Sequence, residues 1–245
     1  MSARWILIGV LTMLGAAWLS REIVIRTHLE GEWLRYILIG PAVLMGALLG
    51  AFAAPRPWRE PLLAAVATMF VSVAVLMMVP RARELLLDQW HQFVVQLAIA
   101  SAAAMGGAAL VRWAVPRFKV GPASIVLLGG LVTIGFVTTM FSIGAAVGID
   151  ATWFRIASVV VGMFLGGFLA QGSITTARPW LCGSGSVLLL VRLIADYRIG
   201  DPQDALLPGG LIGIGLGRWG ARVAWKRMVA RGHRPEVDVP AAHIS

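Results

Sequence analysis

The chain is poor in the residues on which most disulfide-rich proteins and many enzymes depend. It has one cysteine, four histidines and no asparagine, and only 13% of its 245 residues are charged. The single cysteine, Cys182, excludes an internal disulfide bond and is more typical of a small buried residue than of a redox centre. Because 58% of the residues are hydrophobic and the mean hydropathy is +0.81, the chain has more apolar surface than a soluble domain of this length can bury. This composition favours a membrane protein.

Long apolar segments occupy almost the whole sequence. Each is about 17 to 25 residues long, which at about 1.5 Å per residue is enough to cross roughly 30 Å of hydrocarbon. We expect an all-α polytopic membrane protein with eight transmembrane helices, near residues 5–19, 33–54, 61–79, 93–115, 122–147, 153–171, 183–199 and 205–223.

The sequence also matches itself at long range. The matching segments are 33–35 (Trp-Leu-Arg) with 153–155 (Trp-Phe-Arg) and 6–11 with 126–131 at a spacing of 120, 56–58 (Arg-Pro-Trp) with 178–180 at 122, and 110–113 (Leu-Val-Arg-Trp) with 216–219 (Leu-Gly-Arg-Trp) at 106. These matches predict a tandem duplication of a four-helix unit.

The duplication predicts the arrangement of the two units. Because each unit has an even number of expected crossings, both units enter the membrane from the same side, and a pseudo-two-fold axis along the membrane normal should relate them. We expect the units to be 1–120 and 121–232, followed by a short polar tail, 233–245. The spacing between matched segments falls from 122 to 106 along the units, so the first unit contains extra residues. We expect these residues to include an amphipathic outer arm near 81–93. Since the copy of the first segment lies in mid-chain, we expect the first segment to be a transmembrane helix rather than a cleaved signal peptide.

The distribution of basic residues predicts the orientation. With a cytoplasmic N-terminus, thirteen basic residues fall on the inner side and eight on the outer side. The positive-inside rule therefore places both termini in the cytoplasm. The basic residues are almost all arginine, which with the absence of asparagine resembles the usage of GC-rich bacterial genes, so we expect a bacterial cytoplasmic (inner) membrane protein. Because these residues flank the spans rather than forming a stripe with aromatics, they do not indicate nucleic-acid binding.

Two charged residues lie inside the seventh expected span. Arg192 and Asp196 are separated by one helical turn, and Tyr197 follows them. Their counterparts in the first unit, Phe70 and Ala74, are uncharged. A charge at the bilayer centre costs about 2.5 to 3.5 kcal/mol on insertion scales, so both side chains should face the helix bundle. They are the candidate substrate or ion pathway, and the alternative is a structural ion pair.

The expected outer arm has a second polar cluster. Glu84, Asp88 and His91 recur at helical spacing and would share one face of a short helix that extends the fourth span outward. Carboxylate and imidazole groups on one face could bind a metal ion, but such a face is more often simply solvated, so we expect neither a metal nor a cofactor. The arm is also a candidate surface for a partner protein.

Small residues recur at matched positions in the second and sixth spans. Gly46 and Gly50 in the first unit, with Gly162 and Gly166 in the second, predict close helix packing, or alternatively an oligomer interface. The segment 215–220 spells GxGxxG, but no strand precedes it, so a nucleotide-binding loop is excluded.

The histidines argue against intramembrane catalysis. His28 and His91 are expected outside and the other two in the cytoplasmic tail, so none can serve the serines of 183–186 as a base or bind haem within the membrane. We expect a transport-type protein, a channel or secondary carrier, with a cavity between the two units near Arg192 and Asp196. The alternative is a non-catalytic subunit that anchors a larger membrane complex. Membrane lipids are the expected partners, with a small-molecule or ion substrate, other membrane proteins or a second copy of the chain as further candidates.

Overall fold

A computed structural model describes residues 3–26, 38–52, 58–114, 121–149, 151–174, 176–195 and 206–232. Within these residues every regular element is an α-helix. The helices are α1 (Ala3–Arg26), α2 (Ile39–Phe52), α3 (Arg59–Met77), α4 (Pro80–Asp88), α5 (Trp90–Ala114), α6 (Pro122–Val147), α7 (Thr152–Gln171), α8 (Pro179–Ser184), α9 (Ser186–Ala195) and α10 (Leu206–Ala230).

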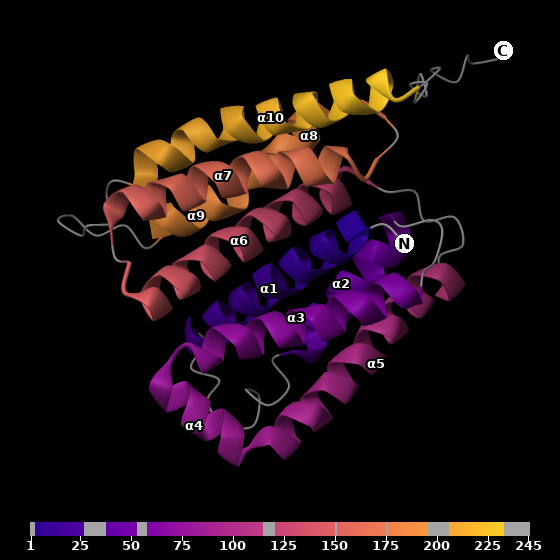
Figure 1. Cartoon of the computed structure of the whole chain (residues 1–245). Coiled ribbons are helices and arrows are strands. Elements are labelled where there is room, and N and C mark those ends of the chain that lie inside the picture. Colours follow the sequence, from indigo (N-terminus) through magenta and orange to yellow (C-terminus); the bar gives the residue numbers. More distant parts are fainter. Residues whose placement is uncertain are drawn as a thin grey trace, which may run out of the picture.

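The helices form an elongated row with α1 and α6 at its centre (Figure 1). On one side α1 packs against α2 and α3, and α5 covers α2 and α3 at that end of the row. On the other side α6 packs against α7, α8 and α9, and α10 covers α7 at the opposite end. Although α1 and α6 are far apart in the sequence, they lie side by side and join the helices α1–α5 to the helices α6–α10.

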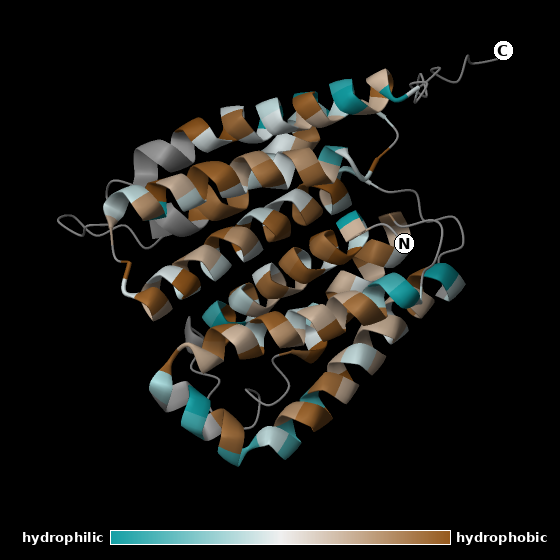
Figure 2. Ribbon diagram, in the orientation of Figure 1, coloured by the Kyte–Doolittle hydropathy of each residue, from teal (hydrophilic) through white to brown (hydrophobic). Residues whose placement is uncertain are grey.

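Five of the helices are long and apolar enough to cross a membrane. They are α1, α3, α5, α6 and α7, whose apolar stretches are 19 to 26 residues long. Large apolar side chains, such as Phe70, Leu110 and Val161, remain exposed on their surfaces, and Figure 2 shows hydrophobic residues along the length of these helices. Such surfaces are stable in lipid rather than in water. The architecture is therefore compatible with a helical membrane protein, as the composition predicts.

The turn between α6 and α7 has a clear local cause. α6 ends at Gly148, whose φ of 76° is left-handed and easy only for glycine. The amide of Ile149 donates to the carbonyl of Gly144 at 2.8 Å, which closes the end of the helix. As a result α7 starts within a few residues and returns beside α6.

Two expected helices are each divided in the structure. The seventh expected span, 183–199, corresponds mainly to α9, and a short helix, α8, precedes it from Pro179 and is separated from it by Gly185 alone. Gly185 lies directly against the backbone of Gly129 and Gly130 in α6, so close packing against α6 accompanies this break. The outer arm is also a helix of its own, because α4 ends at Asp88 and α5 begins at Trp90.

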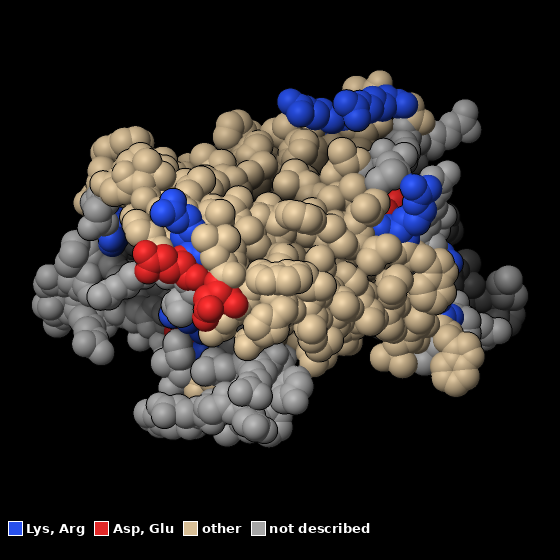
Figure 3. Space-filling view, turned by 60° about the horizontal axis from the view of Figure 1, so that its bottom comes forward, with Lys and Arg blue, Asp and Glu red and all other residues tan. Residues whose placement is uncertain are grey.

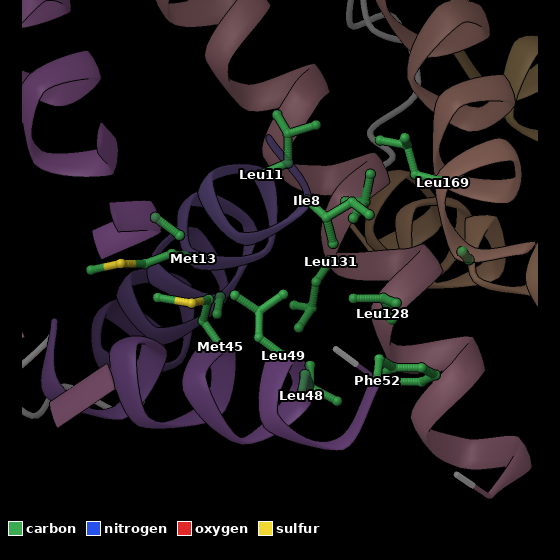
Figure 4. Packing of buried hydrophobic residues seen from close by; sticks show 14 of the residues in the cluster. Ile8, Leu11, Met13, Met45, Leu48, Leu49, Phe52, Leu128, Leu131 and Leu169 are labelled. Carbon is green, nitrogen blue, oxygen red and sulfur yellow. The ribbon is translucent and has the colours of Figure 1, made fainter. Parts of the chain in front are cut away.

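The core is centred on α1. Its side chains Ile8 and Leu11 meet Met45 from α2, Leu131 from α6 and Leu169 from α7 in one buried cluster (Figure 4). The cluster therefore continues from the first group of helices into the second without a polar layer between them.

Candidate functional site

The contact between α1 and α6 depends on one glycine from each helix. A methyl group added at Gly15 would overlap the carbonyl oxygen of Leu131, and one added at Gly135 would overlap the carbonyl oxygen of Leu11. The two contacts are reciprocal, because Gly135 follows Gly15 by 120 residues and Leu131 follows Leu11 by the same number. At this level the backbones of α1 and α6 are in direct contact.

Reciprocal glycine contacts also join α2 to α5 and α7 to α10. In the first group, Gly46 of α2 lies against the carbonyl of Ala104 in α5, and Gly107 of α5 lies against the carbonyl of Val43 in α2. In the second group, α7 and α10 make the same two contacts at Gly167 with Gly217 and at Gly220 with Phe164. The α7 positions follow those of α2 by 121 residues, and the α10 positions follow those of α5 by 113.

The other glycines of the expected packing faces also lie in close contacts. Gly50 lies against α5, where a methyl group would be 3.0 Å from the Cα of Ala108. Gly162 and Gly166 face α6 instead, and a methyl group at Gly162 would be 2.6 Å from the Val137 side chain. All of these contacts are within the single chain.

Most buried hydroxyl groups are satisfied by their own helices. Thr12, Thr68, Thr133 and Ser158 each donate to the carbonyl four residues earlier, at 2.7 to 2.8 Å. A hydroxyl that bonds to its own helix has little left to offer a ligand. These residues are therefore accounted for by helix structure alone.

Gln171, at the end of α7, is fully buried and holds the following loop. Its Nε2 donates to the carbonyl of Thr176 at 2.7 Å, and its Oε1 accepts from the amide of Arg178 at 3.0 Å. The thiol of Cys182 also points at Oε1, at 3.6 Å. Gln171 thus fixes the path from α7 into α8, and Cys182 is a buried part of that connection.

The charged pair that the sequence singles out is described only in part. Arg192 lies in α9, but its side chain is not among the described groups, and Asp196 and Tyr197 lie outside the described residues. The preceding residues show how α9 sits, since Leu189 and Leu190 are buried while Val191 is 57% exposed. α9 therefore packs one face against the second group of helices, and the pathway at Arg192 stays a prediction.

The polar cluster of the outer arm is spread over two helices. Glu84 and Asp88 lie on α4, whereas His91 lies in the first turn of α5, and all three are exposed. Among the described residues, no three His, Cys, Asp or Glu side chains are grouped so that they could hold a metal ion.

Basic residues, which served above to predict the orientation in the membrane, gather at one end of the molecule. At the end where α1, α3, α6 and α8 begin, the described basic residues are Arg4, Arg59, Arg112, Arg178, Arg218, Arg222, Lys226, Arg227 and Arg231. Figure 3 shows charged side chains toward the two ends of the molecule, an uncharged surface between them, and a row of basic side chains on the edge that α10 forms. The one acidic residue described at the basic end is Glu60, which is 3% exposed.

Three polar groups at this end are buried without a hydrogen-bond partner in the described structure. They are Nη2 of Arg4, Oε2 of Glu60 and Nε of Arg218. Arg218 has an aromatic partner, since its guanidinium carbon lies 3.5 Å from the centre of the Trp180 ring. Arg4 lies against Gly172 at the end of α7, where a methyl group would be 2.6 Å from Nη2.

Comparison with known proteins gives no further identification, because no family model, no curated protein and no solved structure matches the chain.

Proposed function

We propose that the protein is a multi-pass membrane transport protein built from two duplicated units, α1–α5 and α6–α10, that lie side by side and face the same way. The reciprocal contact of Gly15 and Gly135 supports the duplication, because residues near a two-fold axis meet their own copies. The repeated contacts of α2 with α5 and of α7 with α10 support it independently.

The parallel arrangement is supported by Arg4. This residue is at the start of α1 and lies against Gly172 at the end of α7. Since α7 runs back along α6 after a short turn, the end of α7 is beside the start of α6. α1 and α6 therefore begin at the same end of the molecule, as two units with an even number of crossings would.

The orientation proposed for the bacterial inner membrane has both termini in the cytoplasm. Nine described basic residues stand against one acidic residue at the end where α1 begins. At the opposite end Arg21, Arg83 and Arg155 are accompanied by Glu22, Glu84 and Asp88. The excess of positive charge favours the first end as the cytoplasmic one.

We place the pathway inside the second unit, along α8 and α9, rather than between the units. The observation that carries this proposal is the interruption of helical structure at the single residue Gly185, seven residues before Arg192, where the backbone stays right-handed (φ −56°, ψ −29°). The counterpart α3 has no such interruption and is uncharged at the corresponding positions. Discontinuous helices commonly form substrate and ion sites in transporters because they expose backbone groups within the membrane. The contact of Gly15 with Leu131 brings the backbones of α1 and α6 together at that level, which favours a site elsewhere.

Cysteine accessibility tests this placement without knowledge of the substrate. In a Cys182→Ala background, Arg192→Cys should react with a membrane-impermeant thiol reagent, because a pathway is hydrated. Leu131→Cys, which replaces a fully buried residue of the central contact, should not react. The proposal fails if Arg192→Cys stays unlabelled in a protein that remains monodisperse, or if Leu131→Cys is the position that reacts.

A second candidate function, as an anchoring subunit of a larger membrane complex, is favoured by α4. This nine-residue helix lies outside the row of packed helices, and Leu87 and Trp90 beside its end are 63% and 65% exposed. A photo-crosslinking amino acid at Leu87 should then give one adduct of defined mass in cells, whereas the same group at Val161, on an exposed face of α7, should not. Equal, diffuse crosslinking at both positions would remove this candidate.

A further inference from the structure

The end of α7 is a point where three arginines from two other helices come together. Arg4 from α1 lies against Gly172, and Arg227 from α10 has its guanidinium carbon 5.6 Å from the centre of the Phe168 ring. Arg231 directly follows the end of α10, and its positive charge acts unfavourably on that of Arg4. Arg4 and Arg227 thus lie at the last turn of α7, and Arg231 adds a third positive charge that acts on Arg4.

One donor of this group of arginines lacks a hydrogen-bond acceptor. Nη2 of Arg4 is buried and meets no hydrogen-bond acceptor in the described part of the chain. A guanidinium nitrogen that is out of contact with water and unpaired is unfavourable, and a neighbouring positive charge makes it more so. An anion at this position would supply the acceptor and reduce the repulsion between Arg4 and Arg231.

The backbone makes space for the guanidinium of Arg4. Position 172 is glycine, and a methyl group there would be 2.6 Å from Nη2 and 2.9 Å from the guanidinium carbon. The backbone of Gly172 is right-handed, with φ of −64°, so glycine is not needed for the conformation of the chain at this point. The absence of a side chain is what lets Arg4 lie against the end of α7.

From these observations we infer that Arg4, Arg227 and Arg231 form a binding site for the phosphate of an anionic phospholipid at the basic end of the molecule. Guanidinium groups match phosphate oxygens with paired N–H donors, and arginine is weakly hydrated, which suits a partly buried site. The site lies where the apolar helix α1 begins and the apolar helix α7 ends, which is the level of lipid headgroups. Trp5, whose ring centre is 5.6 Å from the Arg4 guanidinium carbon, provides the aromatic group typical of that level.

The inference is independent of the pathway proposed along α9. A protein with no transport activity could still hold a lipid between α1, α7 and α10. The two proposals therefore fail separately, the first by thiol labelling at position 192 and the second by lipid binding.

Native mass spectrometry of the full-length protein in detergent tests the site. Phosphatidylglycerol should bind in preference to phosphatidylcholine, and Arg4→Gln or Arg231→Gln should weaken its binding about tenfold, as expected for loss of one charge-assisted contact. Arg21→Gln and Arg83→Gln, which remove the same charge from exposed positions at the other end, should bind as the wild type does.

Gly172→Ala separates a built site from general electrostatic attraction. It keeps every charge but displaces the Arg4 guanidinium, which can move because it ends a flexible side chain, so binding should weaken as in Arg4→Gln. Gly106→Ala, where a methyl group meets nothing within 4 Å, is the matched control. Wild-type affinity in Gly172→Ala, equal binding of phosphatidylcholine, or displacement of the lipid by millimolar inorganic phosphate would each overturn the inference.

Discussion

Gly15 of α1 and Gly135 of α6 face each other across the centre of the molecule, and a methyl group at Gly15 would be 3.0 Å from the backbone nitrogen of Gly135. Each glycine also lies against a carbonyl one turn earlier in the other helix. Close approach of backbones through small residues is the usual way for helices to associate in lipid, where burial of apolar surface gives little gain. This pair joins α1 to α6.

Substitution of Gly15 by alanine should destabilise the protein by about 1–3 kcal/mol, because the methyl group must displace backbone atoms rather than a flexible side chain. Gly135→Ala should have an effect of similar size, since its surroundings are the reciprocal ones. Thermal unfolding in detergent micelles measures both. Gly40→Ala and Gly106→Ala, at positions with open space, are the controls, and equal unfolding temperatures for all four variants would contradict the packing described.

Gln171→Leu should destabilise the connection between α7 and α8. The substitution keeps a similar volume but leaves the Thr176 carbonyl and the Arg178 amide without their bonds, at a cost of about 1–3 kcal/mol for each group that stays buried. Faster proteolysis within 172–178 should accompany a lower unfolding temperature. Gln96→Leu, on the partly buried face of α5, should change neither measurement.

Trp180→Leu should remove the stacking partner of Arg218. Contact at 3.5 Å between the guanidinium and the ring is worth about 0.5–2 kcal/mol. Nε of Arg218 is buried without a hydrogen-bond partner among the described residues, so the group would also lose its aromatic neighbour. The unfolding temperature should fall more than in Trp153→Leu, which replaces a tryptophan that is 68% exposed. An equal fall in the two variants would mean that the stacking contributes nothing.

The proposed pathway predicts loss of flux from Arg192→Ala and from Asp196→Ala in proteoliposomes, with chloride, potassium and protons as probe ions. An intramembrane charge that faces a pathway acts on the permeating species, so its removal should abolish flux without unfolding the protein. Arg83→Ala, on the exposed helix α4, should keep wild-type flux. Flux that survives in both variants would exclude the pair from the pathway.

Five of the eight spans expected from the sequence correspond to long apolar helices, because those apolar runs are bounded by charged residues, proline or tryptophan. The second expected span corresponds to the 14-residue helix α2, which is shorter than expected. The sequence does not predict the break at Gly185 or the separation of α4 from α5, since neither is marked by hydrophobicity. The break at Gly185 depends on contact with Gly129 and Gly130, which are more than fifty residues away. The local pattern of hydrophobic residues carries no information about packing between distant segments.

The spacings of matched sequence segments can be compared with the spacings of matched helix contacts. The match of Arg112-Trp113 with Arg218-Trp219 gives a spacing of 106, whereas the glycine contacts of α5 and α10 recur at 113. The difference of seven residues is about two helical turns, so both alignments bring the same helix face forward and the sequence alone does not choose between them. Gly15 and Gly135 could have been found from their spacing of 120, because residues on a pseudo-two-fold axis contact their own copies.

The basic end illustrates a different limit. Arg4, Arg227 and Arg231 act in the sequence only as markers of orientation, since residues 4 and 231 are at opposite ends of the chain. Arg4 lies at Gly172 and Arg227 at Phe168 because α1, α7 and α10 all have an end on the same side of the molecule, which depends on how distant helices pack. The sequence therefore predicts the charge of this region but not the site.

Disulfide formation between α1 and α6 tests the central claim most directly. In a Cys182→Ala background, Leu11→Cys combined with Leu131→Cys should crosslink on mild oxidation, because parallel, side-by-side units bring these two copies to the same level of the central contact. Leu11→Cys combined with Phe141→Cys should not crosslink, since Phe141 lies almost three turns further along α6. Efficient crosslinking of the second pair and none of the first would contradict the arrangement of two parallel units joined through α1 and α6.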